Sequence, residues 1–369
     1  MKLEQTNRII IKIGSALLFN ETSGSLNKEW LNSLAEDVKY LRENDKEVII
    51  VSSGAIAMGA KDLDLDMKNM KMDMNQAVSA VGQIHLMGSF KSAFEKNEIK
   101  ISQILLTLDD TEQRRRSINA RRTIDTLLKL GIVPVVNEND TIATSEIRYG
   151  DNDRLASRVA QITNADTLIL LSDVDGLYDK NPKIFKNAKL IKKVENLNKD
   201  LKNINFKGNN EFGSGGMNTK IEAAKICLLS GCDMIIANGL YSNPIDKIIK
   251  NNNCTLFISK TSKLDARKKW IISSVSPKGE LIIDDGAKKA LANGKSLLAA
   301  GIIKVFGKFK KGDHVKILDK SKNECARGLS SFASDEISKI LGHHSKEIGK
   351  ILGYISKSEV IHKDDMVEI

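Results

Sequence analysis

A glycine-rich loop that ends in a lysine is the segment of this chain best suited to bind a phosphate. Residues 212–220 read Phe-Gly-Ser-Gly-Gly-Met-Asn-Thr-Lys, and a helical pattern begins where the loop ends. Glycines let a backbone direct its N–H groups at an anion without side chains in the way. The positive end of the following helix and the ammonium of Lys220 would strengthen that attraction. The loop predicts a phosphate site, although many such turns before helices are only structural.

Two further turns near the N-terminus follow β-branched runs. Lys12 interrupts the apolar run 8–13, and a lysine there is costly to bury unless its ammonium reaches an anion. The alternative is a strand-end lysine whose ammonium reaches water, but Gly14 allows close backbone approach and favours a phosphate. Ser53 and Gly54 follow the next run, and they form either a second anion-binding turn or a tight helix–sheet contact.

Two clusters of acidic and amide side chains come later in the chain. Residues 137–140 read Asn-Glu-Asn-Asp and residues 150–153 read Gly-Asp-Asn-Asp, with no histidine beside them. This donor set favours Mg²⁺ or the amino group of a substrate over zinc. The alternative is a pair of Asx turns with solvated charges. A last candidate segment, Ser172-Asp173, ends another apolar run, and Asp173 there would cap a helix or contact a nucleotide.

These residues share a position relative to the predicted elements, because each segment follows a strand or begins a helix. Apolar strand patterns alternate with amphipathic helix patterns over residues 1–258, which predicts a mainly parallel sheet sandwiched between helices. Ligands of such sheets bind beyond the carboxyl ends of the strands. The predicted strands are 8–13, 48–52, 101–106, 132–136, 167–171, 234–237 and 255–258, and the main helices are 27–44, 74–97, 112–130, 154–163 and 218–230.

The pattern changes near residue 278, where short strands separated by glycine-containing turns begin. We expect strands at 280–284, 302–306, 314–318 and 325–330, with helices at 287–293 and 334–340. The sequence therefore predicts an α/β catalytic domain over 1–258, a linker over 259–277, a small mainly-β domain over 278–356 and a C-terminal tail over 357–369.

Composition and charge are those of a globular protein of the cytoplasm. The chain has 369 residues, 41% of them hydrophobic, and its four cysteines lack metal-ligand spacing. The apolar start is broken by Lys12 and Gly14, so we expect no secretory signal and no membrane anchor. The net charge of +10 is spread as +2 over 1–258, +4 over 259–277 and +4 over 278–369. Solvated surface lysines explain this excess better than affinity for a polyanion.

Taken together, the motifs resemble those of the glutamate 5-kinases, a branch of the amino acid kinase superfamily. Six motifs carry the resemblance in order over nearly all of residues 1–258: Lys12-Ile-Gly-Ser, Ser53-Gly-Ala-Ile-Ala, Asn137-Glu-Asn-Asp, Gly150-Asp-Asn-Asp, Ser172-Asp-x-x-Gly-Leu-Tyr and Gly215-Gly-Met-x-Thr-Lys220. The C-terminal part resembles the PUA domain that many of these enzymes carry, with matches that include Gly279-Glu-Leu, Asp285-Gly-Ala and Gly342-His-His-Ser.

The resemblance implies ATP-dependent phosphorylation of the glutamate side-chain carboxylate to glutamyl 5-phosphate, the first step of proline synthesis. It implies that Lys12 and Lys220 contact the transferring phosphoryl group and that Asp153 holds both lysines. It places glutamate at Ser53, Asp140 and Asn152, with Asp151 adjacent. It assigns the nucleotide to Ser172, Asp173, Ser214, Gly215, Gly216, Met217, Asn218, Thr219 and Lys220. ATP and Mg²⁺ are the implied cofactors, and no residue is assigned to the metal.

Two other functions fit parts of the sequence. An acetylglutamate kinase would share the fold, but it lacks the PUA-like tail and its substrate has no free amino group for Asp140 and Asp151. An RNA-binding protein acting through the tail is disfavoured, because the tail carries only +4 and lacks an aromatic stacking face. The resemblance also implies inhibition by L-proline and a dimer or tetramer. The arginines of 114–122 either border the substrate site or form an exposed basic helix face, and we favour the exposed face.

Overall fold

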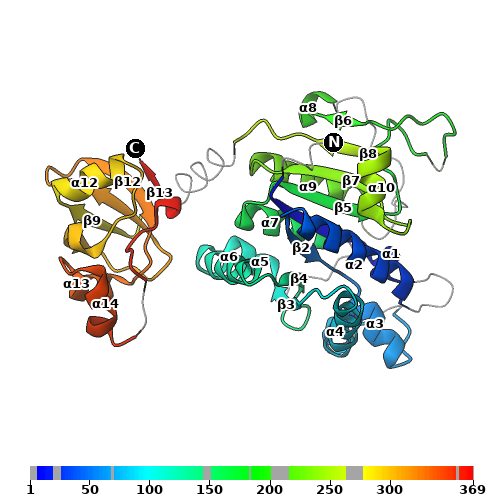
Figure 1. The fold of residues 1–369 in the computed structure, drawn as a ribbon, viewed down its shortest axis with the longest axis horizontal. Helices are drawn as coiled ribbons and strands as arrows, with labels where there is room; N and C mark the ends of the chain where they lie inside the picture. Colours follow the sequence, from blue (N-terminus) through cyan, green and yellow to red (C-terminus); the bar gives the residue numbers. More distant parts are fainter. Residues whose placement is uncertain are drawn as a thin grey trace. The chain divides into compact units, whose positions relative to one another are not determined.

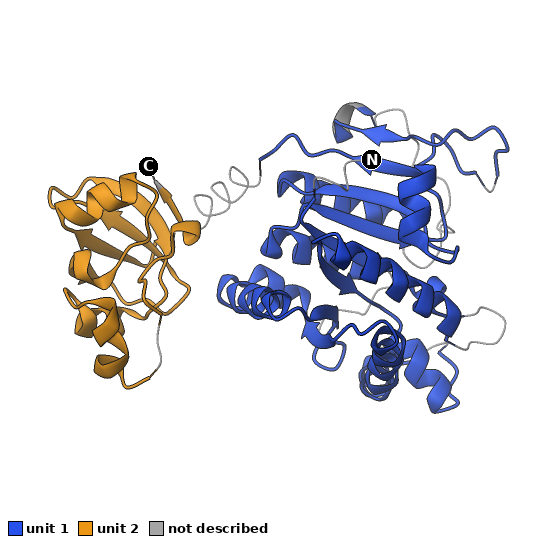
Figure 2. Ribbon diagram, in the orientation of Figure 1, with its two compact units in different colours: residues 1–263 blue, residues 264–369 orange. Residues whose placement is uncertain are grey.

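The computed structural model of the protein describes residues 6–19, 26–67, 70–143, 151–182, 184–200, 216–262, 277–354 and 357–368. The chain divides into two compact units, residues 1–263 and 264–369 (Figure 2). The predicted linker 259–277 spans this division, and its residues 263–276 lie outside the described part of the chain.

An eight-stranded sheet runs through the described part of the first unit, in the order β3-β4-β2-β1-β5-β7-β8-β6 (Figure 1). Its neighbouring strands are parallel except at β7 and β8, which run antiparallel. The strands are β1 (Arg8–Ile13), β2 (Glu47–Val51), β3 (Ile101–Leu106), β4 (Val133–Glu138), β5 (Thr167–Ser172), β6 (Lys193–Val194), β7 (Asp233–Asn238) and β8 (Cys254–Phe257). The predicted α/β architecture with a mainly parallel sheet is confirmed.

Helices cover both faces of this sheet. The core on one face includes residues of α2 (Lys28–Glu43), α4 (Met72–Glu95) and α10 (Pro244–Asn251). The core on the other face includes residues of α6 (Arg114–Lys129), α7 (Asp151–Thr163) and α9 (Met217–Leu229). The shorter helices of the unit are α1 (Ser15–Leu18), α3 (Ala55–Asp62), α5 (Leu108–Glu112) and α8 (Leu197–Asp200).

Strand β1 shows how the sheet directs its side chains. Ile9, Ile11 and Ile13 belong to the core under α2 and α4, whereas Ile10 belongs to the core under α7 and α9. Successive side chains of a strand point to opposite faces, so Lys12 projects to the same side as Ile10. Lys12 therefore leaves the sheet toward α7 and α9.

The predicted helix 112–130 is interrupted. Thr107 and Asp110 form a capping box that starts α5 at Leu108, which lies before the predicted start. Helix α5 ends at Glu112, and the extended backbone of Gln113 (φ −70°, ψ 113°) separates it from α6. The break turns the chain before the arginines of α6.

Helices α3 and α4 meet through glycines. A Cβ atom on Gly82 would lie 1.8 Å from the carbonyl oxygen of Ala55, and one on Gly59 would lie 1.9 Å from that of Val78. The two backbones therefore touch, with no room for a methyl group between them. Helix α3 begins after Gly54, whose φ of 99° suits glycine, so this crossing fixes the turn that holds Ser53.

The described part of the second unit contains a five-stranded sheet in the order β10-β9-β11-β12-β13. Its strands are β9 (Gly279–Ile283), β10 (Ile302–Phe306), β11 (His314–Leu318), β12 (Glu324–Leu329) and β13 (Met366–Glu368), with helices α12 (Asp285–Ala292), α13 (Ser334–Ile340) and α14 (Ser345–Leu352). Strand β13 lies within the residues predicted as a tail and pairs with β12. This unit is the small mainly-β domain that the sequence predicts.

Membrane insertion finds no support in the helices that the structure describes, because none is both long and apolar enough to form a span.

Candidate active site

The predicted site residues gather at the carboxyl ends of neighbouring strands. Lys12 is the penultimate residue of β1. It is paired in register with Val51 of β2 on one side and with Leu170 of β5 on the other. Ser53 follows β2, and Ser172 ends β5. Parallel strands bring their carboxyl ends to one edge of the sheet, as expected for an α/β ligand site.

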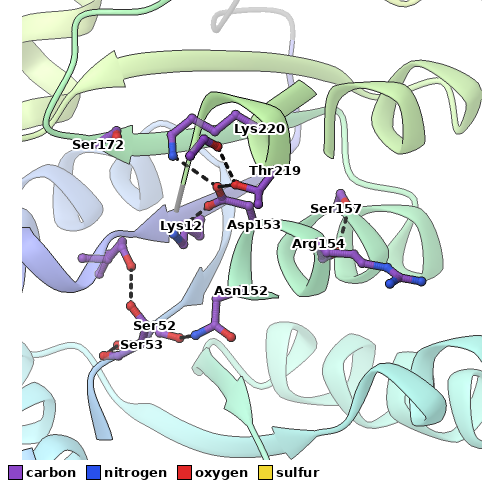
Figure 3. A network of polar contacts seen from close by, with 12 residues as sticks. Lys12, Ser52, Ser53, Asn152, Asp153, Arg154, Ser157, Ser172, Thr219 and Lys220 are labelled. Atoms are coloured by element: carbon purple, nitrogen blue, oxygen red, sulfur yellow. Dashed lines mark hydrogen bonds and ion pairs between the residues drawn. The ribbon is translucent and has the colours of Figure 1, made fainter. Parts of the chain in front are cut away.

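At this edge, Asp153 lies between Lys12 and Lys220 (Figure 3). Its Oδ1 atom forms an ion pair with Lys12 Nζ at 2.6 Å, and its Oδ2 atom accepts a hydrogen bond from Lys220 Nζ at 3.2 Å. The Asp153 side chain is 1% exposed and the two lysine side chains are 9% and 8% exposed. Three charged groups from β1, α7 and α9 thus meet in a largely buried site.

The charge of Asp153 depends on its neighbours. Burial would raise the pKa of this carboxyl, but the nearby Lys12 and Lys220 ammonium groups and the Thr219 hydroxyl together hold it below its usual value. The carboxylate therefore stays ionised at neutral pH. Taken by themselves, the two ammonium groups and one carboxylate carry a net positive charge, which suits an anionic ligand.

Asn152 connects the start of α7 to the strands beside it. Its Nδ2 atom donates to the carbonyl of Ser52 at 2.7 Å and to Oδ1 of Asn137 at 3.2 Å. The hydroxyl of Ser53 donates to the carbonyl of Ile13 at 3.1 Å. These bonds fix the Asn152 side chain with both amide protons occupied, so that its Oδ1 atom is the part able to accept from a ligand.

Asn137 is a site residue that the sequence indicated only as part of a motif. Its Oδ1 atom faces the backbone N–H of Glu138 at 2.9 Å, which identifies that atom as the oxygen because a backbone N–H can only donate. Its Nδ2 atom is buried and meets no acceptor among the described residues. A buried donor without a partner points to a ligand acceptor. The Asn-Glu-Asn-Asp motif was the available signal, but the sequence could not show which amide is left unpaired.

Asp140 lies in the turn after β4 and is 8% exposed. Its carboxylate has no hydrogen bond or ion pair within the described part of the chain, and burial raises its pKa to about 6. A buried carboxylate without a cation is an unfavourable state that a bound ammonium group would relieve.

The predicted nucleotide residues lie around the ends of β5 and α9. The hydroxyl of Ser172 donates to Oδ1 of the exposed Asp173 at 3.2 Å, and Asp173 caps no helix among the described residues. Gly216 is the N-cap of α9, so Met217, Asn218, Thr219 and Lys220 form its first turn. Ser214 and Gly215 lie outside the described residues. Asp151 is the first residue of α7.

A protein-held metal site is not apparent in the residues that the structure describes, since they contain no group of three His, Cys, Asp or Glu side chains that could hold an ion. The two oxygens of Asp153 face the lysines and Thr219 rather than an open position. These residues do not fit the ligand set of a resident Mg²⁺ ion.

Comparison with known families agrees with the predicted fold. Residues 7–238 match the model of the amino acid kinase family, and residues 279–352 match the model of the PUA domain. The first match covers the first seven strands of the sheet and the whole lysine–aspartate–lysine group, and it defines the protein as an amino acid kinase.

Known relatives narrow this class. The chain is 67% identical over 369 residues to the glutamate 5-kinase of Pelagibacter ubique (strain HTCC1062), with 100% of both chains covered. It is 46% identical over 365 residues to the glutamate 5-kinase of Paramagnetospirillum magneticum (strain ATCC 700264 / AMB-1), covering 99% of this chain and 98% of that protein. Among solved structures, the UMP kinase from Ureaplasma parvum is similar with a TM-score of 0.48 and 20% identity, covering 69% of this chain and 99% of that one. The chain therefore belongs to the glutamate 5-kinases of the amino acid kinase family, as its motifs predicted.

Proposed function

We propose that the protein transfers the γ-phosphoryl group of ATP to the side-chain carboxylate of L-glutamate, forming L-glutamyl 5-phosphate and ADP. This reaction is the first step of proline biosynthesis. The observation that carries the proposal is the buried Lys12–Asp153–Lys220 group at the carboxyl edge of the sheet. The carboxylate of Asp140, which has no partner among the described residues and lies at the same edge of the sheet, suits the free amino group of glutamate.

The reaction requires no general base from the protein. The attacking glutamate carboxylate is already ionised, so an oxygen–phosphorus bond can form while the bond from the γ-phosphorus to the bridging oxygen of ADP breaks, without a general base. The developing charge lies on the phosphoryl oxygens and on ADP, where positioned cations stabilise it. We assign this role to Lys12 and Lys220, and we assign to Asp153 the role of holding both ammonium groups in place.

The glutamate would be held by complementary polar atoms. We assign its ammonium group to the carboxylate of Asp140 and to Oδ1 of Asn152, the acceptors that lack a partner in the described residues. We assign a carboxylate oxygen of glutamate to the Nδ2 donor of Asn137, which has no acceptor in the described part of the chain. Ser53 borders this subsite, and its hydroxyl is oriented by the carbonyl of Ile13. Asp151, adjacent in sequence, remains a predicted contact.

The nucleotide would lie over the ends of β5 and α9. We assign ATP to Ser172, Asp173 and the segment 214–220, in which the N-terminus of α9 directs backbone N–H groups outward. Mg²⁺ would enter as part of the MgATP substrate, since the described residues form no cage for it. The protein side chains then act on the phosphoryl group directly through their two ammonium groups.

The assay that tests the proposal measures acyl phosphate formed by the purified full chain with MgATP, trapped as a hydroxamate. L-Glutamate and N-acetyl-L-glutamate are compared as acceptors, because an acetylated nitrogen cannot give Asp140 a cation. We expect product with L-glutamate and little with the acetylated compound. Equal or greater turnover of N-acetyl-L-glutamate would instead indicate an acetylglutamate kinase.

Two regulatory properties are proposed on the family resemblance. We propose inhibition by L-proline and assembly into a dimer or tetramer. The same hydroxamate assay with added L-proline tests the first, and the molar mass measured by light scattering tests the second. RNA binding through the second unit is not proposed as the main role, because the candidate site residues all belong to the first unit.

A further inference from the structure

We propose that Thr219 is a positioning residue for phosphoryl transfer. Its hydroxyl shares one carboxylate oxygen of Asp153 with Lys220 and so limits how firmly that oxygen holds the lysine. The family resemblance assigns Thr219 to the nucleotide, and in the structure its hydroxyl also lies within hydrogen-bonding distance of Asp153 Oδ2. This inference rests on the proposed kinase function. It concerns the difference between Lys12 and Lys220 in how tightly the Asp153 carboxylate holds their ammonium groups.

The carboxylate of Asp153 is occupied unevenly. Its Oδ1 atom has Lys12 Nζ at 2.6 Å, while its Oδ2 atom has Thr219 Oγ1 at 3.0 Å and Lys220 Nζ at 3.2 Å (Figure 3). The Asp153 side chain is 1% exposed, so water cannot replace any of these contacts. Lys12 therefore has one oxygen to itself, and Lys220 shares the other.

The hydroxyl proton of Thr219 has two acceptors within reach. Its Oγ1 atom lies 3.0 Å from Asp153 Oδ2 and 2.8 Å from the carbonyl oxygen of Gly216. The Gly216 carbonyl already accepts the backbone N–H of Thr219 at 3.0 Å, whereas a carboxylate forms the stronger, charge-assisted bond. On this ground we assign the hydroxyl proton of Thr219 to the Asp153 carboxylate rather than to the nearer Gly216 carbonyl.

Two consequences follow for the reaction. Without the Thr219 hydroxyl, Asp153 Oδ2 would accept a hydrogen bond from Lys220 and not from Thr219. The ion pair between Asp153 and Lys220 would then be tighter, and the Lys220 ammonium would interact less strongly with the phosphoryl oxygens. The carboxylate would also lose one of the groups that keep its pKa low, after Lys12 and Lys220. Protonation of Asp153 at acidic pH, which releases both lysines, would then begin at a higher pH.

The experiment compares Thr219→Val, which removes the hydroxyl and keeps the shape, with Thr219→Ser, which keeps the hydroxyl. In the full chain we expect the valine variant to lower kcat about 10- to 100-fold, the worth of one hydrogen bond to a buried charge, while KM for glutamate changes less than about threefold. We also expect the acid limb of its kcat–pH profile to move to higher pH. Serine should restore both properties toward those of the unchanged protein.

The matched control is Ser157→Ala, which removes a hydroxyl from the same helix as Asp153. Ser157 is buried, and its hydroxyl donates to the carbonyl of Arg154 at 2.7 Å rather than to Asp153. Its kcat and acid limb should stay unchanged. Thermal unfolding of every variant checks folding, and Thr219→Ala supplies a second hydroxyl-free protein if the valine variant unfolds.

The possible outcomes separate the inference from the proposed function. A hydroxyl-free variant with unchanged kcat and an unchanged acid limb would overturn the positioning role. A raised KM for ATP with normal kcat would also overturn it and leave Thr219 as a nucleotide contact only. Loss of kcat in the serine variant as large as in the valine variant would show that the methyl group matters instead. Absence of glutamate phosphorylation by the unchanged protein would refute the proposed function itself.

Discussion

The pH dependence of glutamate use provides a direct test of the role assigned to Asp140. Burial raises the pKa of this carboxyl from 3.8 to about 6, and only the ionised form can attract the glutamate ammonium. With a pKa of about 6, roughly nine-tenths of the free enzyme is ionised at pH 7 and roughly one-tenth at pH 5. Lowering the pH from 7 to 5 should therefore reduce kcat/KM for glutamate about tenfold through this group alone.

The same shift has a consequence for stability. Because the pKa of Asp140 is raised by folding, the folded chain binds a proton more tightly than the unfolded chain between pH 4 and 6, and this group destabilises the fold as pH rises through that window. The cost in the free protein at neutral pH is about 3 kcal/mol, and a bound ammonium would offset it. Glutamate should therefore raise the melting temperature more at pH 7.5 than at pH 5.

The assay measures kcat/KM for glutamate at saturating MgATP from pH 5 to pH 8, beside kcat/KM for MgATP at saturating glutamate. The second profile accounts for titration of the nucleotide. Asp140→Asn keeps the shape and removes the charge, so it should lower kcat/KM for glutamate at pH 7.5 by about 30- to 1,000-fold, a loss of about 2–4 kcal/mol, and flatten the acid limb. An acid limb that persists unchanged in the asparagine variant would refute the reasoning.

Three further predictions follow from contacts in the first unit. Lys12→Ala and Lys220→Ala should each lower kcat about 10²–10³-fold and raise KM for glutamate far less, and near-normal turnover in steady-state assays of both variants would contradict their assigned role. Asn152→Ala should mainly raise KM for glutamate in the same assays, whereas a fall confined to kcat would oppose a binding role. Gly82→Ala should lower the free energy of unfolding in urea by about 1–3 kcal/mol, because its methyl group would meet a backbone carbonyl at 1.8 Å. The control in the same helix is Gly88→Ala, because a Cβ atom on Gly88 would have nothing within 4 Å. Helix propensity predicts that this change raises the free energy of unfolding by about 0.5–1 kcal/mol. Equal effects at both sites would disprove the packing argument.

Much of the fold was predictable because its strands are continuous apolar runs. Strands at 8–13, 101–106, 302–306 and 314–318 have the predicted bounds, and the remaining predicted strands differ from their predicted bounds by at most two residues at either end. The division of residues 112–130 into two helices was missed, because the break at Gln113 is set by local backbone conformation and no proline or glycine marks it. Strand β6 was missed because two residues are too few to show alternation.

The sequence could nominate the members of the candidate site but could not show how they are bonded to one another. Lys12, Asp153 and Lys220 could be grouped because their motifs resemble those of the glutamate 5-kinases, and the predicted strand–helix pattern placed these motifs near the carboxyl edge of the sheet. The sequence could not show that Asn152 uses both amide protons on Ser52 and Asn137, or that Asn137 keeps a donor unpaired. Such details depend on distances between side chains that are far apart in the chain, which periodicity does not encode.

The wide separation of the three charged residues along the chain bears on how the enzyme is made. Lys12 and Asp153 leave the ribosome well before α9, and chains are synthesised from the N-terminus. Before α9 is synthesised, Lys12 and Asp153 can form only an ion pair with each other, and this pair has no net charge. The second ammonium group of the proposed phosphoryl-transfer site arrives only when α9 packs against α7, so that site is completed late in the folding of the first unit.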